Sequence, residues 1–215
     1  MIKCEYFNNG LEELKLKNYS KAIYYFSLAI QKNKNNYHAY DKRAYSKIFT
    51  SDKTSSKDFK KGAEIHVSLL NNFIKKEPNI PILYYLRGVR MVQLSNYNFA
   101  LEDFNKAIEL KIDFQDAYLS RANLKYNLND IDGAIEDISS LIIYNPNVSK
   151  YFYRRSQYKK TKNDINGALI DVSKAIDIEP TNKSFYFFRG MLFHQLGDNS
   201  SASNDLKKFD YYNNI

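Results

Sequence analysis

Two charged residue types recur in this sequence at a constant interval of 34 residues. One column holds arginine and the other aspartate, with matched spacing. Guanidinium groups bind anions and carboxylates bind metals or act as acids, so the columns could hold ligand-binding charges or a metal or acid site. The first column contains Arg87, Arg121, Arg155 and Arg189, with Arg43 as a further member, and the second contains Asp103, Asp137, Asp171 and Asp205.

A structural role accounts better for both columns. In a short antiparallel helical hairpin, the middle of the first helix lies across from the middle of the second. An arginine and an aspartate at these places come close together, within one unit or across adjacent units. The guanidinium can then bind the carboxylate through two hydrogen bonds. We therefore predict a recurring structural ion pair, with ligand binding as the alternative.

The other residue types that carry chemistry do not form a pattern. His38, His66 and His194 stand far apart, and no His/Cys spacing resembles a zinc site. The sequence contains neither a Gly-rich phosphate loop nor an HExxH motif. We therefore predict no catalytic residues, no metal site and no cofactor, and expect that the protein is not an enzyme.

The elements that position these residues are pairs of helices. In residues 81–114, apolar residues with helical spacing precede the turn "SNYN" at 95–98, and a second apolar stripe with helical spacing follows it. A turn this short makes the two helices antiparallel. Small residues at two facing columns allow close approach: Gly88, Ala122, Ser156 and Gly190 on the first helix, and Ala100, Ala134, Ala168 and Ala202 on the second.

The 34-residue unit, with its aromatic, small and alanine columns and a closing proline at Pro146 or Pro180, resembles the tetratricopeptide repeat (TPR). The resemblance implies an all-α fold, a right-handed α-solenoid of about six helix–turn–helix repeats. We expect a single solenoid over residues 1–215. Its repeats are predicted at about 3–36, 37–80, 81–114, 115–148, 149–182 and 183–215. The second is irregular, and we expect a loop insertion of about seven residues near 50–61.

The resemblance also implies that the first helices line a concave face. Aromatic rings beside amides on these helices suit a peptide or protein segment, and Lys150, Arg154 and Lys160 favour an acidic residue or a C-terminal carboxylate. We therefore predict a non-catalytic scaffold for protein–protein interaction. The candidate peptide-binding residues are Tyr85, Leu119, Asn123, Tyr126, Asn127, Lys150, Tyr153, Arg154, Gln157, Phe187, Phe188 and His194.

Composition bounds the alternatives. The formal charge of +8 allows a basic solenoid that binds nucleic acid, but the lysines are scattered and often stand beside acidic residues, which disfavours it. Cys4 is the only cysteine, and the sequence shows neither a secretory signal nor a membrane span, so we expect a cytoplasmic protein that binds no membrane. The sequence stops soon after the last second helix. Leu206, Phe209 and Tyr212 could therefore support a structural self-associating oligomer, such as a homodimer through an uncapped C-terminal repeat.

Overall fold

The computed structural model describes residues 5–50 and 52–213 and places them in twelve α-helices without a strand. The predicted fold class is confirmed: the described chain is all-α and built from helix–turn–helix pairs. Cys4 lies outside the described residues. The chain divides into two compact units, residues 1–110 and 111–215, and each unit is described by itself. The single solenoid over 1–215 stays a prediction.

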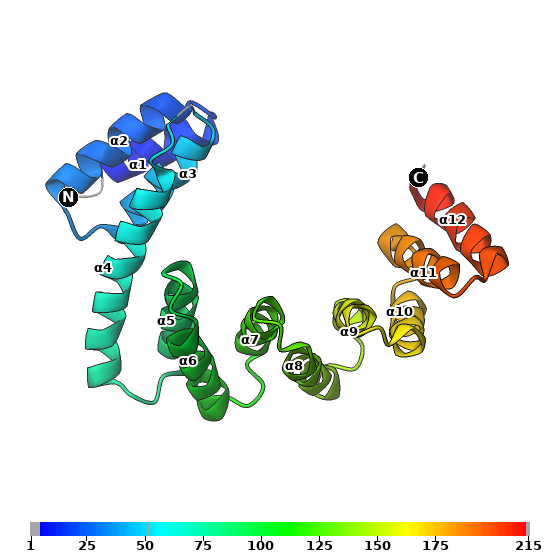
Figure 1. Ribbon diagram of the computed structural model, residues 1–215. Coiled ribbons are helices and arrows are strands. Elements are labelled where there is room, and N and C mark those ends of the chain that lie inside the picture. Colours follow the sequence, from blue (N-terminus) through cyan, green and yellow to red (C-terminus); the bar gives the residue numbers. More distant parts are fainter. Residues whose placement is uncertain (1–4, 51, 214–215) are drawn as a thin grey trace. The chain divides into compact units, whose positions relative to one another are not determined.

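The first unit contains three consecutive helix pairs. In each pair the two helices lie side by side, as Figure 1 shows for α5 and α6 in green. Their bounds are α1 (Glu5–Lys15), α2 (Tyr19–Lys32), α3 (Tyr37–Ile48), α4 (Ser55–Lys76), α5 (Pro81–Gln93) and α6 (Tyr97–Leu110).

The second unit repeats the arrangement with three more pairs, coloured from green to red in Figure 1. Its helices are α7 (Gln115–Asn127), α8 (Ile131–Tyr144), α9 (Ser149–Thr161), α10 (Ile165–Ile178), α11 (Lys183–Gln195) and α12 (Asn199–Asn213).

The turn inside most pairs has one recurring backbone conformation. Its middle residue has a positive φ, and the amide of the next residue donates to a carbonyl five residues earlier, as from Asp130 to Lys125. This is the Schellman arrangement, which satisfies the last carbonyls of the first helix. In all three turns of the second unit an aspartate, Asp130, Asp164 or Asp198, then caps the following helix. The residues with positive φ are Lys17, Ser95, Asn129, Asn163 and Gly197.

The long helix α4 corrects the predicted loop insertion near 50–61. Residues 55–61 form the first turns of α4, which has 22 residues, whereas the other second helices have 14 or 15. Figure 1 shows α4, in cyan, reaching from α3 to α5. The polar composition of this stretch suggested a loop. It folds as helix because Asp58 is buried against Arg43 and Lys47.

The extra length of α4 keeps its packing face in phase. Arg43 binds Asp58 near the start of α4, and Arg87 binds Asn71 near its end. Asp58 and Asn71 are thirteen positions apart along α4. On α8, the two residues that bind the neighbouring arginines are Asp137 and Ser139, only two positions apart. The difference of eleven residues makes about three turns of helix. Both neighbouring first helices therefore meet the same side of α4.

The predicted arginine–aspartate pairing is confirmed in the structure. Each arginine donates hydrogen bonds from two nitrogens to a buried aspartate of the same helix pair. The Nη2–Oδ1 distances are 2.6 to 2.8 Å. Several of these arginines also donate from Nη1 to the preceding second helix, as Arg155 does to Ser139. The pairs are Arg43–Asp58, Arg87–Asp103, Arg121–Asp137, Arg155–Asp171 and Arg189–Asp205.

Candidate functional site

A cavity of about 580 Å³ opens in the second unit. Its walls come from α7, α9 and α11, which are the first helices of three consecutive pairs. Aromatic rings, side-chain amides and cations line it, and none of the lining residues carries a carboxylate. The lining residues are Asn123, Tyr126, Asn127, Arg154, Gln157, Tyr158, Lys160, Thr161 and Phe188.

Two tyrosines from adjacent first helices form one wall of the cavity. The rings of Tyr126 and Tyr158 stack with centroids 4.7 Å apart and planes 21° apart. The Tyr158 hydroxyl donates to Asn123 Oδ1 at 2.8 Å. The Tyr126 hydroxyl lies 3.1 Å from Thr161 Oγ1, whose own proton is donated to the carbonyl of Gln157. Tyr126 is therefore the donor of that pair, and the wall is held in place from both ends.

The raised pKa of Tyr158 keeps its hydroxyl uncharged in this wall. Burial raises the pKa of the Tyr158 hydroxyl above its usual value, and the nearby Arg154 charge acts in the opposite direction with a smaller effect. The phenol therefore stays protonated at neutral pH and continues to donate to Asn123.

The rest of the cavity lining includes an apolar ring and two cations. Phe188 is buried, with 8% of its surface exposed, and the ammonium of Lys160 lies 5.6 Å from the centroid of its ring. The ring of Tyr153 packs edge-on against the ring of Phe188. Arg154 is exposed on α9, and among the described residues no carboxylate forms a salt bridge with it. The cavity thus combines a fixed aromatic surface with positive charge.

Comparisons with known proteins concern the fold. A tetratricopeptide repeat protein from Parabacteroides merdae has a TM-score of 0.67 with 15% identity, over 98% of this chain and 79% of that one. MamA from Desulfovibrio magneticus has 0.62 with 15% identity, over 83% and 95%. YrrB, described as a TPR protein with an unusual peptide-binding site, has 0.55 with 16% identity, over 87% and 91%. No family model and no curated protein sequence matches this chain.

The chain has the TPR fold. The resemblance stated from the 34-residue columns is therefore confirmed at the level of the fold. At identities of 15 or 16% the likeness to these solved structures does not extend to a partner or an activity.

Six of the twelve residues proposed from the sequence line the cavity between α7, α9 and α11. They come from three different helices and are Asn123, Tyr126, Asn127, Arg154, Gln157 and Phe188. Whether they contact a peptide stays a prediction.

The other six proposed residues do not line this cavity. Tyr85 belongs to the first unit, where its ring packs near Phe104, and Leu119 is half-buried on α7. Tyr153 packs against Phe185 and Phe188. In the remaining three, Lys150 lies over the ring of Tyr151, Phe187 packs against Phe209, and His194 Nδ1 lies 3.0 Å from Asn199 Oδ1.

Two lining residues, Tyr158 and Thr161, were not proposed from the sequence. Tyr158 stands in a column whose neighbours in adjacent repeats are Leu124 and Leu192, both buried. The column therefore indicated core. A tyrosine among leucines was the available signal, because a buried phenol needs a hydrogen-bond partner and so points to a polar neighbour.

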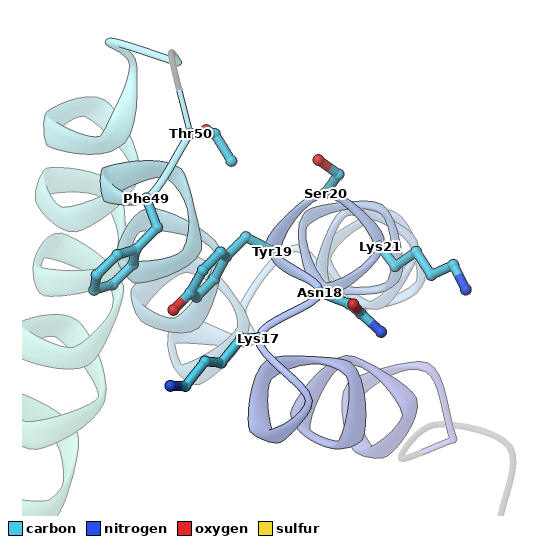
Figure 2. Close-up of a pocket in the computed structure, with 7 residues that line it drawn as sticks. All are labelled: Lys17, Asn18, Tyr19, Ser20, Lys21, Phe49 and Thr50. Atoms are coloured by element: carbon cyan, nitrogen blue, oxygen red, sulfur yellow. The ribbon is translucent and has the colours of Figure 1, made fainter.

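A second cavity, of about 330 Å³, lies in the first unit where the α1–α2 turn meets the end of α3. Tyr19 and Phe49 stack there at 4.6 Å. Figure 2 shows the side chains of Lys17 and Lys21 pointing to opposite sides of this pocket. Its cations therefore do not converge, unlike the lining of the cavity in the second unit.

The side chains expected at an open C-terminal face are only partly open. Phe209 and Tyr212 pack against the core of their own unit, where Tyr212 stacks on Tyr186. Leu206 and Tyr211 stay exposed. Within the described residues, no group of three or more potential metal ligands occurs, and no helix is long and apolar enough to span a bilayer.

Proposed function

We propose that this chain is a non-catalytic interaction module, and that its second unit holds a peptide segment of a partner protein in the cavity between α7, α9 and α11. One observation carries the proposal: Asn123, Arg154 and Phe188, from the first helices of three consecutive repeats, line one cavity. Its volume of about 580 Å³ lies in the range of roughly 300–1,000 Å³ found for ligand pockets.

The chemistry of the lining supports a peptide rather than a reacting substrate. Tyr126, which is half-buried, offers rigid apolar area at a small entropy cost, as aromatic anchors do at protein interfaces. Asn123, Asn127 and Gln157 offer amides that match the main-chain groups of an extended segment. The binding of a peptide by YrrB, a protein of the same fold, agrees with this function.

A photo-crosslinking amino acid at Asn127, an exposed residue of the lining, tests the proposal. Irradiation in an extract of the source cells is expected to attach a partner peptide there, which mass spectrometry then identifies. The same probe at Glu136, which is exposed on α8 outside the cavity, is the matched control.

The attachment at Asn127 should disappear when Tyr126→Ala and Arg154→Ala are added, provided that circular dichroism shows an intact fold. Identical products from both probe positions would contradict the proposed site. Undiminished attachment in the double variant would contradict it as well.

A further inference from the structure

The positive charge of the chain is concentrated in the first unit. Residues 1–110 contain 18 Lys and Arg residues and 11 Asp and Glu residues, a net charge of +7, whereas residues 111–215 contain 14 and 13, a net charge of +1. The excess is largest over residues 42–61, the end of α3 and the start of α4, where seven cations occur with two carboxylates. An anionic partner attracted by charge would therefore approach this part of the chain.

Both carboxylates of this stretch are already bound inside the protein. Asp52 and Asp58 form salt bridges with cations of α3. The other cations of the stretch include Lys53, Lys57 and Lys60, which are exposed, and no carboxylate of the described residues forms a salt bridge with them. The charge of these three lysines is therefore available to a partner.

Large apolar side chains are exposed at the same end of the helix pair. Tyr45, Ile48 and Phe49 lie on one side of the last turn of α3 by helical spacing, and 46, 57 and 50% of their surfaces are exposed. The half-buried ring of Tyr19, from the start of α2, stacks on the ring of Phe49 at 4.6 Å, and Figure 2 shows the two rings side by side. We call these four residues the apolar tip.

The lysines are held close to the apolar tip. Thr54 Oγ1 accepts a hydrogen bond from Lys47 Nζ at 2.7 Å, which ties the α3–α4 connection to the last turn of α3. Lys53 directly precedes Thr54, and Lys57 lies in the first turn of α4. Both cations therefore belong to the same end of the helix pair as Ile48, the neighbour of Lys47.

Phe49 departs from the pattern of the repeat. The residue six positions after the pairing arginine is polar in each later repeat: Gln93, Asn127, Thr161 and Gln195. Those repeats complete their cores without an aromatic ring at this position, so packing of the repeat does not require one. The repeat that contains Phe49 also carries the extra turns of α4 with their lysines. Apolar exposure and positive charge are therefore two departures of one repeat.

The kind of apolar side chain separates a lipid surface from a nucleic acid. Bases stack on aromatic rings, whereas an aliphatic side chain such as Ile48 gains more from hydrocarbon. Tyr19 and Tyr45 combine an apolar ring with a polar hydroxyl, as do side chains at the boundary between headgroups and acyl chains. Lys17 and Lys21 point to opposite sides of the neighbouring pocket, and cations that are spread out suit many headgroups better than one ligand.

We infer that the apolar tip docks on an anionic lipid bilayer, where Ile48 and Phe49 enter the boundary between headgroups and acyl chains and Lys53 and Lys57 bind the headgroups. Apolar insertion and attraction to anionic lipids are each weak and together hold a protein on a membrane. The sequence-based expectation of no membrane binding rested on the lack of a spanning segment, which such a contact does not need. The inference concerns the first unit and goes beyond the peptide site proposed in the second.

Sedimentation of the full chain with lipid vesicles tests the inference. Vesicles of phosphatidylcholine with about 30% phosphatidylserine should bind the chain at least about tenfold more strongly than vesicles of phosphatidylcholine alone, and added salt should weaken the binding. Ile48→Ser/Phe49→Ser should lower the affinity about tenfold, and so should Lys53→Gln/Lys57→Gln. Equal binding to both lipid compositions would overturn the inference.

Matched controls lie at the far end of α4. Leu69→Ser/Phe73→Ser removes exposed apolar side chains, and Lys75→Gln/Lys76→Gln removes exposed cations, about 27 Å along the helix from Lys57. Affinity should stay within about twofold in both, because exposed charges act over only about 8–10 Å in physiological salt. Circular dichroism checks the fold of every variant. Equal losses in the control and tip variants would contradict docking through the tip.

A fluorescent reporter tests the contact with the tip intact. The sequence contains no tryptophan, so Phe49→Trp introduces a single one at a half-exposed position. Its emission should shift to shorter wavelength when the phosphatidylserine vesicles are added, whereas the emission of Phe73→Trp should not shift. An unshifted spectrum of vesicle-bound Phe49→Trp would refute the inference. So would tight binding of a single-stranded RNA of about 20 nucleotides that is lost in Ile48→Ser/Phe49→Ser while vesicles stay unbound.

Discussion

Arg155 and Asp171 face each other across α9 and α10 in a two-pronged ion pair. Arg155 Nε donates to Oδ2 at 2.8 Å, and Nη2 donates to Oδ1 at 2.7 Å. Lys159 adds a second cation 2.8 Å from Oδ2, and only 2% of Asp171 is exposed. One buried carboxylate therefore balances two positive side chains at the centre of a helix pair.

Removal of this carboxylate should destabilise the second unit. Asp171→Ala leaves Arg155 and Lys159 without their partner in a mostly desolvated position, and loss of one partner of a buried pair costs about 3 kcal/mol or more. Urea unfolding followed by circular dichroism should show a lower midpoint. Asp132→Ala, which breaks the exposed pair with Lys162, is the control and should change the midpoint little. Equal effects of the two variants would show that the buried arginine–aspartate pair does not stabilise the unit.

Two glycines in the same repeat column should respond oppositely to alanine. A Cβ on Gly88 would lie 2.8 Å from Phe104 Cε1, whereas a Cβ on Gly190 would meet nothing closer than 3.4 Å. Gly88→Ala should cost roughly 1–3 kcal/mol through overpacking. Gly190→Ala should be neutral or stabilise by up to about 1 kcal/mol, because alanine favours the helix. Unfolding midpoints of both variants decide, and destabilisation by Gly190→Ala would contradict this geometry.

A histidine cluster in the first unit should make stability depend on pH. His66 stacks on Tyr37 at 3.9 Å, and its Nδ1 accepts a hydrogen bond from Arg90 Nε at 3.0 Å. Arg90 also binds Asp41 through Nη2 at 2.6 Å. Burial, with a further contribution from the Arg90 charge, lowers the pKa of His66 from 6.5 to about 4. The same causes act on His38, whose pKa is also lowered.

The sign of the effect follows from linkage. The unfolded chain binds a proton at His66 as the pH falls below about 6.5, while the folded chain resists it until about 4. Stability from the neutral imidazole is therefore complete above pH 6.5 and declines toward pH 4. His66→Gln keeps an acceptor for Arg90 and does not titrate. Its urea midpoint should fall less than the wild-type midpoint between pH 7.5 and 5.0, and parallel declines would refute the role of His66.

The sequence predicted what the repeat makes uniform. Arginine and aspartate columns in register determined the ion pairs, because antiparallel pairing of short helices leaves one geometry for them. It did not predict the departures from uniformity. The extra turns of α4 are polar, and their helical state depends on burial of Asp58 against Arg43. Gly88 has less room for a side chain than Gly190, because the ring of Phe104 lies beside it.

In the cavity, too, residues that follow the repeat could be predicted and a residue that departs from it could not. First-helix residues such as Asn123 and Arg154 could be placed from the repeat register. Tyr158 could not, because its column also holds Leu124 and Leu192 and therefore indicated core. Its ring is buried, but its hydroxyl reaches the amide of Asn123 in the cavity wall. Tyr158 therefore belongs both to the core and to the cavity wall. The residue types of its column indicate only the first of these roles.

This dual position of Tyr158 gives a variant that separates folding from binding. Tyr158→Leu installs the residue that the neighbouring repeats carry in this column, so the core should stay filled and stability should change by about 1 kcal/mol. Tyr126 then loses its stacking partner and Asn123 its donor, which frees one wall of the cavity. Because rigid aromatic anchors dominate such interfaces, the affinity for a fluorescently labelled copy of the peptide identified by crosslinking at Asn127 should fall about tenfold in fluorescence anisotropy. Tyr24→Leu, at an exposed tyrosine of the first unit, should leave affinity unchanged. Full affinity in Tyr158→Leu would place the peptide elsewhere on the chain.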